Sequence, residues 1–84
     1  MDAHSHLTAK DVAAMFADPA EAAKFPSRLT VDEAAQLARV PKQTIYAWSS
    51  QGLLKGCSRK VGKRLLILRD KFVLKIFNEG LHGN

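Results

Sequence analysis

The 84-residue chain has few of the features on which secreted proteins and enzymes depend. It contains a single cysteine, Cys57, so no internal disulfide can form, and no neighbouring base is evident that would activate this thiol as a nucleophile. No segment resembles a signal peptide or a membrane-spanning run. The five glycines do not form a phosphate-binding loop, which would follow a strand and open a helix. We therefore expect a non-enzymatic, cytoplasmic protein that binds no membrane.

Ligands for a metal ion are also scarce. His4 and His6 form an H-x-H pair near one end of the chain, and His82 lies near the other. Zinc sites combine histidines with cysteines or acidic ligands at short, regular spacings, and no such partners accompany these three residues. We expect no metal ion and no other cofactor.

Basic residues, in contrast, are abundant and unevenly distributed. The formal net charge is +5. Residues 1–26 carry two basic and four acidic side chains, a net charge of −2, whereas residues 27–84 carry eleven basic and four acidic ones, a net charge of +7. This asymmetry predicts a polyanion-binding face on the C-terminal two-thirds of one small domain.

A capping box at Thr30-Val31-Asp32-Glu33 predicts the start of a helix. In this motif the Thr30 hydroxyl accepts a hydrogen bond from the backbone N–H of Glu33, and the Glu33 carboxylate accepts one from the N–H of Thr30. The helix should stop near Arg39–Val40, because Pro41 disfavours the helical conformation of the residue before it. An apolar stripe at helical spacing gives this helix a buried face: Ala34, Leu37 and Ala38.

A second helix is predicted from Pro41 to about Gln51. Proline is common at the first helical position, and Gly52 stands where a left-handed residue usually ends a helix. Ile45 and Trp48, three residues apart, should point into the core. Two short amphipathic helices joined by a turn of two or three residues are typical of a helix-turn-helix.

The opposite face of the second helix carries Lys42, Gln43, Tyr46 and Ser50. Early positions of a recognition helix reach base edges, where glutamine can bond an adenine and lysine a guanine or a phosphate. Tyr46 is better suited to a phosphate or a sugar. On an isolated helix these side chains would indicate an ordinary solvated face, but the basic segment that follows favours contact with DNA.

That basic segment is predicted to be a β-hairpin. Val61-Gly62-Lys63-Arg64 offers a two-residue Gly-X loop of type II′, with strands at about Cys57–Val61 and Arg64–Leu68. The apolar run at residues 65–68 should be well covered by the helices. Four of the six residues from 59 to 64 are basic: Arg59, Lys60, Lys63 and Arg64. Such a charge run is often only solvated surface, but beside a recognition helix it has the geometry of a wing that follows a neighbouring groove.

The N-terminal segment predicts two further helices. Thr8 and Asp11 can cap the first, and Asp18-Pro19 can start the second. The first has an apolar stripe: Ala9, Val12, Ala13 and Phe16. This stripe should pack on the rest of the same chain; the alternative is a dimer or protein-contact arm.

One more helix should follow the hairpin. Asp70 can cap a helix of about Lys71–Glu79, which Gly80 would end. Its apolar stripe should pack behind the strands: Phe72, Val73, Ile76 and Phe77.

In their order along the chain, residues 29–79 resemble the small MerR-like winged-helix proteins of the excisionase type. The similar segments are LTVDEAA (29–35), VPKQTIY (40–46), GLL (52–54) and KVGKR (60–64). In that family the second helix enters the major groove, and the wing contacts the flanking minor groove or backbone. The resemblance implies the first role for Lys42, Gln43, Thr44 and Tyr46, and the second for Lys60, Lys63 and Arg64. The chain departs from the family at Pro41, which replaces a small polar cap, and in the longer loop 55–58.

The expected fold is mainly α with a small β-hairpin. It is a winged helix-turn-helix at residues 29–79, with a helical extension at 1–28 and a frayed tail at 80–84. The expected function is sequence-specific binding of double-stranded DNA.

Excisionase-like proteins are recombination directionality factors, which bind and bend DNA near an attachment site. The resemblance therefore implies an integrase or recombinase as a partner, and self-association on DNA. A small promoter-binding transcriptional regulator is the first alternative, and a protein-interaction adaptor is the second. No small-molecule effector is expected, because the chain is too short for an effector domain.

Overall fold

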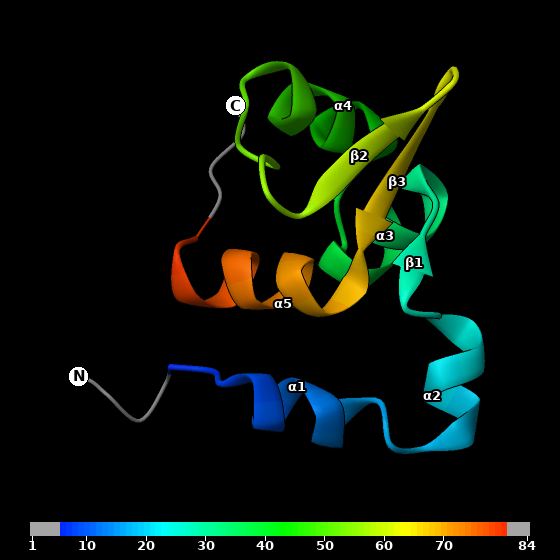
Figure 1. Cartoon of the computed structure of the whole chain (residues 1–84), viewed down its shortest axis with the longest axis vertical. Coiled ribbons are helices and arrows are strands. Elements are labelled where there is room, and N and C mark those ends of the chain that lie inside the picture. The colour runs from blue at the N-terminus through cyan, green and yellow to red at the C-terminus, as the bar shows by residue number, and fades with distance from the viewer. Residues whose placement is uncertain (1–5, 81–84) are drawn as a thin grey trace.

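The computed structural model describes residues 6–80 (Figure 1). His4, His82 and residues 81–84 of the expected tail lie outside this range. The elements follow one another as α1 (Ala9–Met15), α2 (Pro19–Lys24), β1 (Arg28–Leu29), α3 (Val31–Ala38), α4 (Lys42–Ser50), β2 (Ser58–Val61), β3 (Arg64–Leu68) and α5 (Arg69–Asn78). A mainly helical domain with a small antiparallel sheet is the fold class that the sequence predicts, and it is consistent with a winged helix-turn-helix.

The sheet contains three strands in the order β1-β3-β2, all antiparallel. Strands β2 and β3 form the predicted hairpin, in which Val61 pairs with Arg64 around a two-residue loop. Gly62 has a φ of +64° and Lys63 has a negative φ, as a type II′ turn requires. Strand β1 was not predicted, because two residues are too few to show an alternating pattern.

Helices α3 and α4 begin and end through local interactions. Both reciprocal hydrogen bonds of the predicted capping box at Thr30 are present, at 3.1 and 2.9 Å. Helix α3 ends at its C-cap Arg39, which adopts the left-handed conformation with a φ of 59°. Pro41 is the N-cap of α4 and not its first helical residue, so this part of the prediction is wrong. Gly52 has the predicted left-handed conformation, with a φ of 77°.

Helix α5 differs from the prediction in two respects. It begins at Arg69 directly after β3, so Asp70 lies in its first turn and does not cap it. Phe77 is 60% exposed, whereas Phe72 and Val73 are buried. With 100° between successive helical residues, Phe77 lies roughly 90° from the centre of the buried face.

The apolar run of β3 is less covered than predicted. Ile67 is buried, Leu65 and Leu66 are half-buried, and Leu68 is 38% exposed. Successive strand residues point to opposite faces of a sheet, and the hairpin projects beyond the helices (Figure 1). The helices therefore cover only one face of β3, near the end of the strand that leads into α5.

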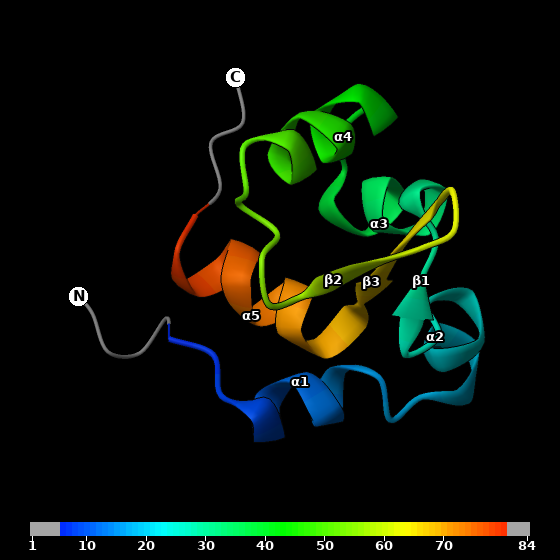
Figure 2. The same ribbon diagram turned by 45° about the horizontal axis from the view of Figure 1, so that its top comes forward.

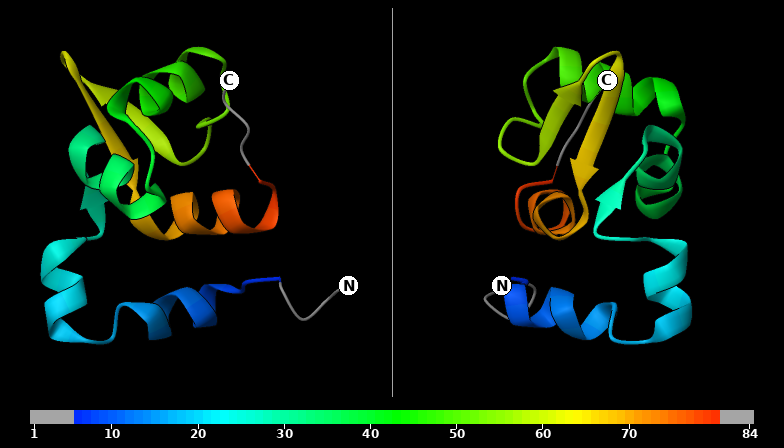
Figure 3. Two further views of the ribbon diagram at one scale, coloured as in Figure 1. Left: turned by 180° about the vertical axis from the view of Figure 1, so that it is seen from behind. Right: turned by 45° about the vertical axis from the view of Figure 1, so that its right-hand side comes forward.

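The N-terminal extension packs against the rest of the chain. Helix α1 runs along α5 on the side away from α4 and the hairpin tip (Figures 1 and 3). Val12 and Phe16 are buried in the same core cluster as Trp48 and Phe72. The stripe of α1 thus packs within the chain in part, as the first of the two alternatives expected: Val12 and Phe16 are buried, whereas Ala9 and Ala13 are exposed.

Specific interactions hold this extension in place. Asn78 Oδ1 accepts a hydrogen bond from the backbone N–H of Leu7, and Asn78 Nδ2 donates one to the Leu7 carbonyl, both at 2.8 Å. The Arg69 guanidinium lies 4.0 Å from the centre of the Phe16 ring, and its Nη1 donates to the Phe25 carbonyl at 2.9 Å. Arg69 thus links both N-terminal helices to the junction of β3 and α5.

Candidate nucleic-acid interface

Helix α4 is oriented by the two residues on its inner face. Ile45 is fully buried and Trp48 is 4% exposed, as the sequence predicts. Trp48 packs against Phe72 of α5, with the ring centres 6.4 Å apart. Burial of these two side chains fixes the rotation of α4 about its axis, so the opposite side of the helix faces solvent (Figure 2).

The outward side of α4 carries three of the four expected recognition residues in exposed positions. Lys42 and Gln43 are exposed in its first turn, and Tyr46 is 55% exposed. Thr44 is half-buried, so it presents less of its side chain. An arrangement with polar side chains at the start of an exposed helix is able to reach base edges in a major groove.

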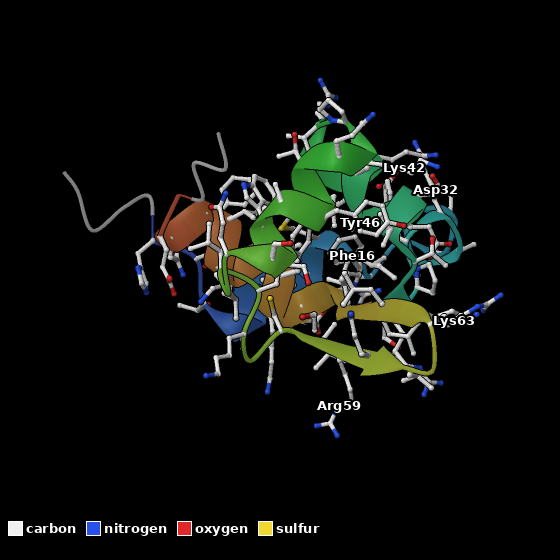
Figure 4. All side chains as sticks on the ribbon, turned by 90° about the horizontal axis from the view of Figure 1, so that it is seen from above. Phe16, Asp32, Lys42, Tyr46, Arg59 and Lys63 are labelled. Carbon is white, nitrogen blue, oxygen red and sulfur yellow. The ribbon has the colours of Figure 1, made fainter. Side chains whose placement is uncertain are left out.

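The hairpin presents its basic residues on more than one side. All four are exposed: Arg59, Lys60, Lys63 and Arg64. Lys63 projects from the tip, and Arg59 extends from the hairpin away from α4 (Figure 4). Lys60 points to the face opposite that of Arg59, because adjacent strand residues alternate. The four residues therefore do not form one continuous surface with α4.

A shallow notch separates α4 from the hairpin. This cavity of about 250 Å³ lies between the start of α3, the outer side of α4 and strand β3. Lys42 and Tyr46 line one wall and Arg64 lines another. The remaining lining residues are Thr30, Val31, Asp32, Leu65 and Leu66. The structure thus brings two expected recognition residues and one expected wing residue to a single depression.

Asp32 is the residue at this notch that the sequence reasoning missed. Its Oδ1 lies 3.3 Å from the Nζ of Lys42, and both side chains are largely exposed, at 68% and 57%. From the sequence, Asp32 is expected only to be one of the acidic residues that are common at a helix N-terminus. The pairing depends on how α3 and α4 cross, which no local signal specifies.

Cys57 has no evident part in this surface. Burial raises the pKa of the Cys57 thiol, whose Sγ donates to the Leu54 carbonyl at 3.4 Å, so it is a packed and unreactive side chain. Among residues 6–80, no group of three or more His, Cys, Asp or Glu side chains is placed to hold a metal ion. No helix in the same range is long and apolar enough to cross a membrane.

Comparison with known proteins identifies a domain family for this chain. A family model described as a helix-turn-helix domain matches residues 28–73. The match begins at β1 and ends within α5, so it includes α3, α4 and the hairpin and leaves out the N-terminal extension. Comparisons with curated proteins and with solved structures give no significant match.

Proposed function

Because the chain belongs to the helix-turn-helix domain family, we propose that it is a sequence-specific double-stranded DNA-binding protein of the excisionase type. A helix-turn-helix domain implies DNA binding and is typically non-enzymatic. The finer proposal is that this protein is a recombination directionality factor, which binds and bends DNA near an attachment site and assists an integrase or recombinase. This role requires access to intracellular DNA, in keeping with the cytoplasmic location expected from the sequence.

The observation that carries the proposal is the position of α4 beside the basic hairpin. The two elements project from the same end of the domain, and the N-terminal extension packs at the opposite end (Figures 1 and 3). Lys42, Gln43 and Tyr46 are exposed on the first element, and Lys63 and Arg64 on the second. A duplex can approach this end without displacing any other element.

We assign the contacts according to chemistry. Gln43 carries both a donor and an acceptor and is suited to the edge of an adenine. Lys42, Tyr46 and the half-buried Thr44 are assigned to phosphates or sugars beside it, and the basic hairpin residues to the flanking minor groove or backbone. Arg59 points away from α4 (Figure 4) and would contact only a duplex that curves around the hairpin.

The proposal includes bending of the DNA, which contacts from both α4 and the hairpin would stabilise. Smooth bending of a 20–30 bp site costs on the order of 1–6 kcal/mol. Phosphate contacts from several copies on adjacent sites would offset this cost, which is why self-association on DNA belongs to the proposal. A promoter-binding regulator could use the same module, and the arrangement of the binding sites distinguishes the two roles.

The test is selection of bound duplexes from random and genomic DNA, followed by footprints across a protein titration. Adjacent direct repeats that fill cooperatively near a recombination site, together with a bend in circular-permutation electrophoresis, are the expected result. A single or palindromic promoter site without a bend would replace the directionality factor by the regulator. Binding with no sequence preference would refute specific recognition and favour a protein-interaction adaptor.

A matched control distinguishes base recognition by the start of α4 from non-specific attraction of DNA to a basic protein. Gln43→Ala should relax the sequence preference in the selection and retain binding to unrelated duplexes. Gln51→Ala removes the same side chain from an exposed position at the other end of α4 and should leave the preference unchanged. Equal behaviour of the two variants would show that the start of α4 does not read bases.

A further inference from the structure

Asp32 is an acidic side chain within a surface that is otherwise suited to a polyanion. It lines the notch with Lys42 and Arg64, and Figure 4 shows Asp32, Lys42 and Tyr46 close together between α3 and α4. A carboxylate at this place repels the phosphates of an approaching duplex. Its presence therefore opposes the binding that the surrounding residues favour.

Asp32 makes only a small contribution to the fold, as an acidic residue in the first turn of α3. The cap of α3 consists of Thr30 and Glu33, whose reciprocal hydrogen bonds measure 3.1 and 2.9 Å without any contribution from Asp32. Its one ion pair among the described residues is that with Lys42, and both partners are more than half exposed. Exposed ion pairs contribute little to stability. We therefore expect Asp32 to affect DNA binding more than the stability of the fold.

The notch has the chemistry of a site for one backbone phosphate. Lys42 supplies an ammonium group from α4, a cationic group that phosphates often bind. Arg64 also lines the notch from β3, although the register of the hairpin places its side chain on the same face of the sheet as that of Arg59. Tyr46 adds a hydroxyl, and Leu65 and Leu66 add apolar surface against which a sugar can pack. One anionic group already occupies this place, because the Asp32 Oδ1 lies 3.3 Å from the Lys42 Nζ.

We propose that this notch binds a phosphate of the DNA backbone, and that Asp32 is an internal competitor of that phosphate for Lys42. The inference rests on the proposed DNA binding. In the free protein the Asp32 carboxylate pairs with the Lys42 ammonium group. In the complex the DNA phosphate takes the place of the carboxylate. Because every duplex carries the same phosphates, Asp32 lowers affinity irrespective of sequence. It thereby shortens the time that the protein spends on any duplex, whether or not that duplex carries the recognised sequence.

The test measures binding of Asp32→Asn to a fluorescein-labelled 20-bp duplex of scrambled sequence by anisotropy. Asparagine keeps the shape of the side chain and removes its charge. Binding should become about two- to fivefold tighter, which corresponds to loss of one exposed ion pair. The slope of log K against log salt should steepen by up to about 0.9, the value for one more neutralised phosphate.

Two matched variants make the test specific to the notch. In a Lys42→Ala background, Asp32→Asn should give a clearly smaller gain, because the contested ammonium group is absent and only the repulsion between the Asp32 carboxylate and the phosphates is relieved. Glu21→Gln removes the same charge from the first turn of α2, at the end of the domain away from α4, and should change affinity by less than half as much. Thermal unfolding followed by circular dichroism should show that each variant is folded.

Three results would overturn the inference: no gain for Asp32→Asn, an equal gain in the Lys42→Ala background, or an equal gain for Glu21→Gln. A single neutral methylphosphonate moved along the duplex gives a further check, because at one position it should remove the gain. The proposed function fails differently. If wild-type protein binds no duplex, DNA binding itself is refuted, and if it binds selected and scrambled duplexes equally, only sequence recognition is refuted.

Discussion

Replacing both Lys63 and Arg64 by alanine should flatten the salt dependence of DNA binding. Both side chains are exposed at the hairpin tip, and neither forms an ion pair with an acidic residue within residues 6–80. Each is therefore free to displace a counterion from a phosphate. Log K falls with log salt by about 0.9 for each phosphate neutralised on B-DNA.

The magnitude follows from the number of basic residues at this end of the domain. Together with Lys42, the four basic hairpin residues give up to about five phosphate contacts and a slope of roughly −4 to −5. Loss of two contacts should reduce the slope to about −3. Fluorescence anisotropy with one duplex at salt concentrations between about 50 and 200 mM measures it directly, since affinity changes strongly in that range.

A control with the same change of charge is available in the N-terminal extension. Lys10 and Lys24 are exposed on α1 and α2, away from the hairpin tip, and their double replacement by alanine should leave the slope nearly unchanged. An unaltered slope for Lys63→Ala/Arg64→Ala would remove the wing from the interface. Equal flattening in both double variants would show that only net charge matters.

Four further substitutions test the fold and the recognition helix. Gln43→Ala should weaken binding to the selected site by about 1–3 kcal/mol, the value of one bidentate base contact, with little change on unrelated duplexes; an equal loss on all duplexes would contradict a base contact. Trp48→Ala should lower the free energy of unfolding by about 3–5 kcal/mol in urea titrations followed by circular dichroism. Trp48→Phe should cost far less, because the buried Nε1 has no hydrogen-bond partner among the described residues and its removal relieves about 1–3 kcal/mol; similar losses for both variants would disprove this. Arg39→Gly should raise the free energy of unfolding by about 0.5–1 kcal/mol, since a left-handed φ of 59° is strained for arginine, and a lower stability would show that the arginine side chain matters more than its backbone.

Local signals predicted the elements of the DNA-binding half with good accuracy. The capping box at Thr30 involves neighbours in sequence, and the structure contains it as predicted. The two-residue loop at Gly62 and the bounds of β3 are also correct, because turn geometry sets the register of a hairpin. The errors at Pro41 and Asp70 concern one or two residues at a helix end, where sequence signals compete.

The candidate site was predicted only in part. Helical periodicity placed Ile45 and Trp48 inside, and so placed Lys42 and Tyr46 outside. The sequence did not indicate that Arg64 would share a notch with Lys42 and that Arg59 would point away from α4. Roles for all of these residues in DNA contact stay predictions until binding is measured.

The sequence by itself determined what depends on neighbours along the chain: where helices begin, which face of α4 is apolar, where the hairpin turns and where positive charge accumulates. Tertiary structure alone decided the pairing of β1 with β3, the attachment of the N-terminal helices through Arg69 and Asn78, and the contact of Asp32 with Lys42. The physical reason is that caps, turns and stripes are set by interactions within about five residues. Contacts between distant segments depend on how packed side chains fix the distance and angle between elements.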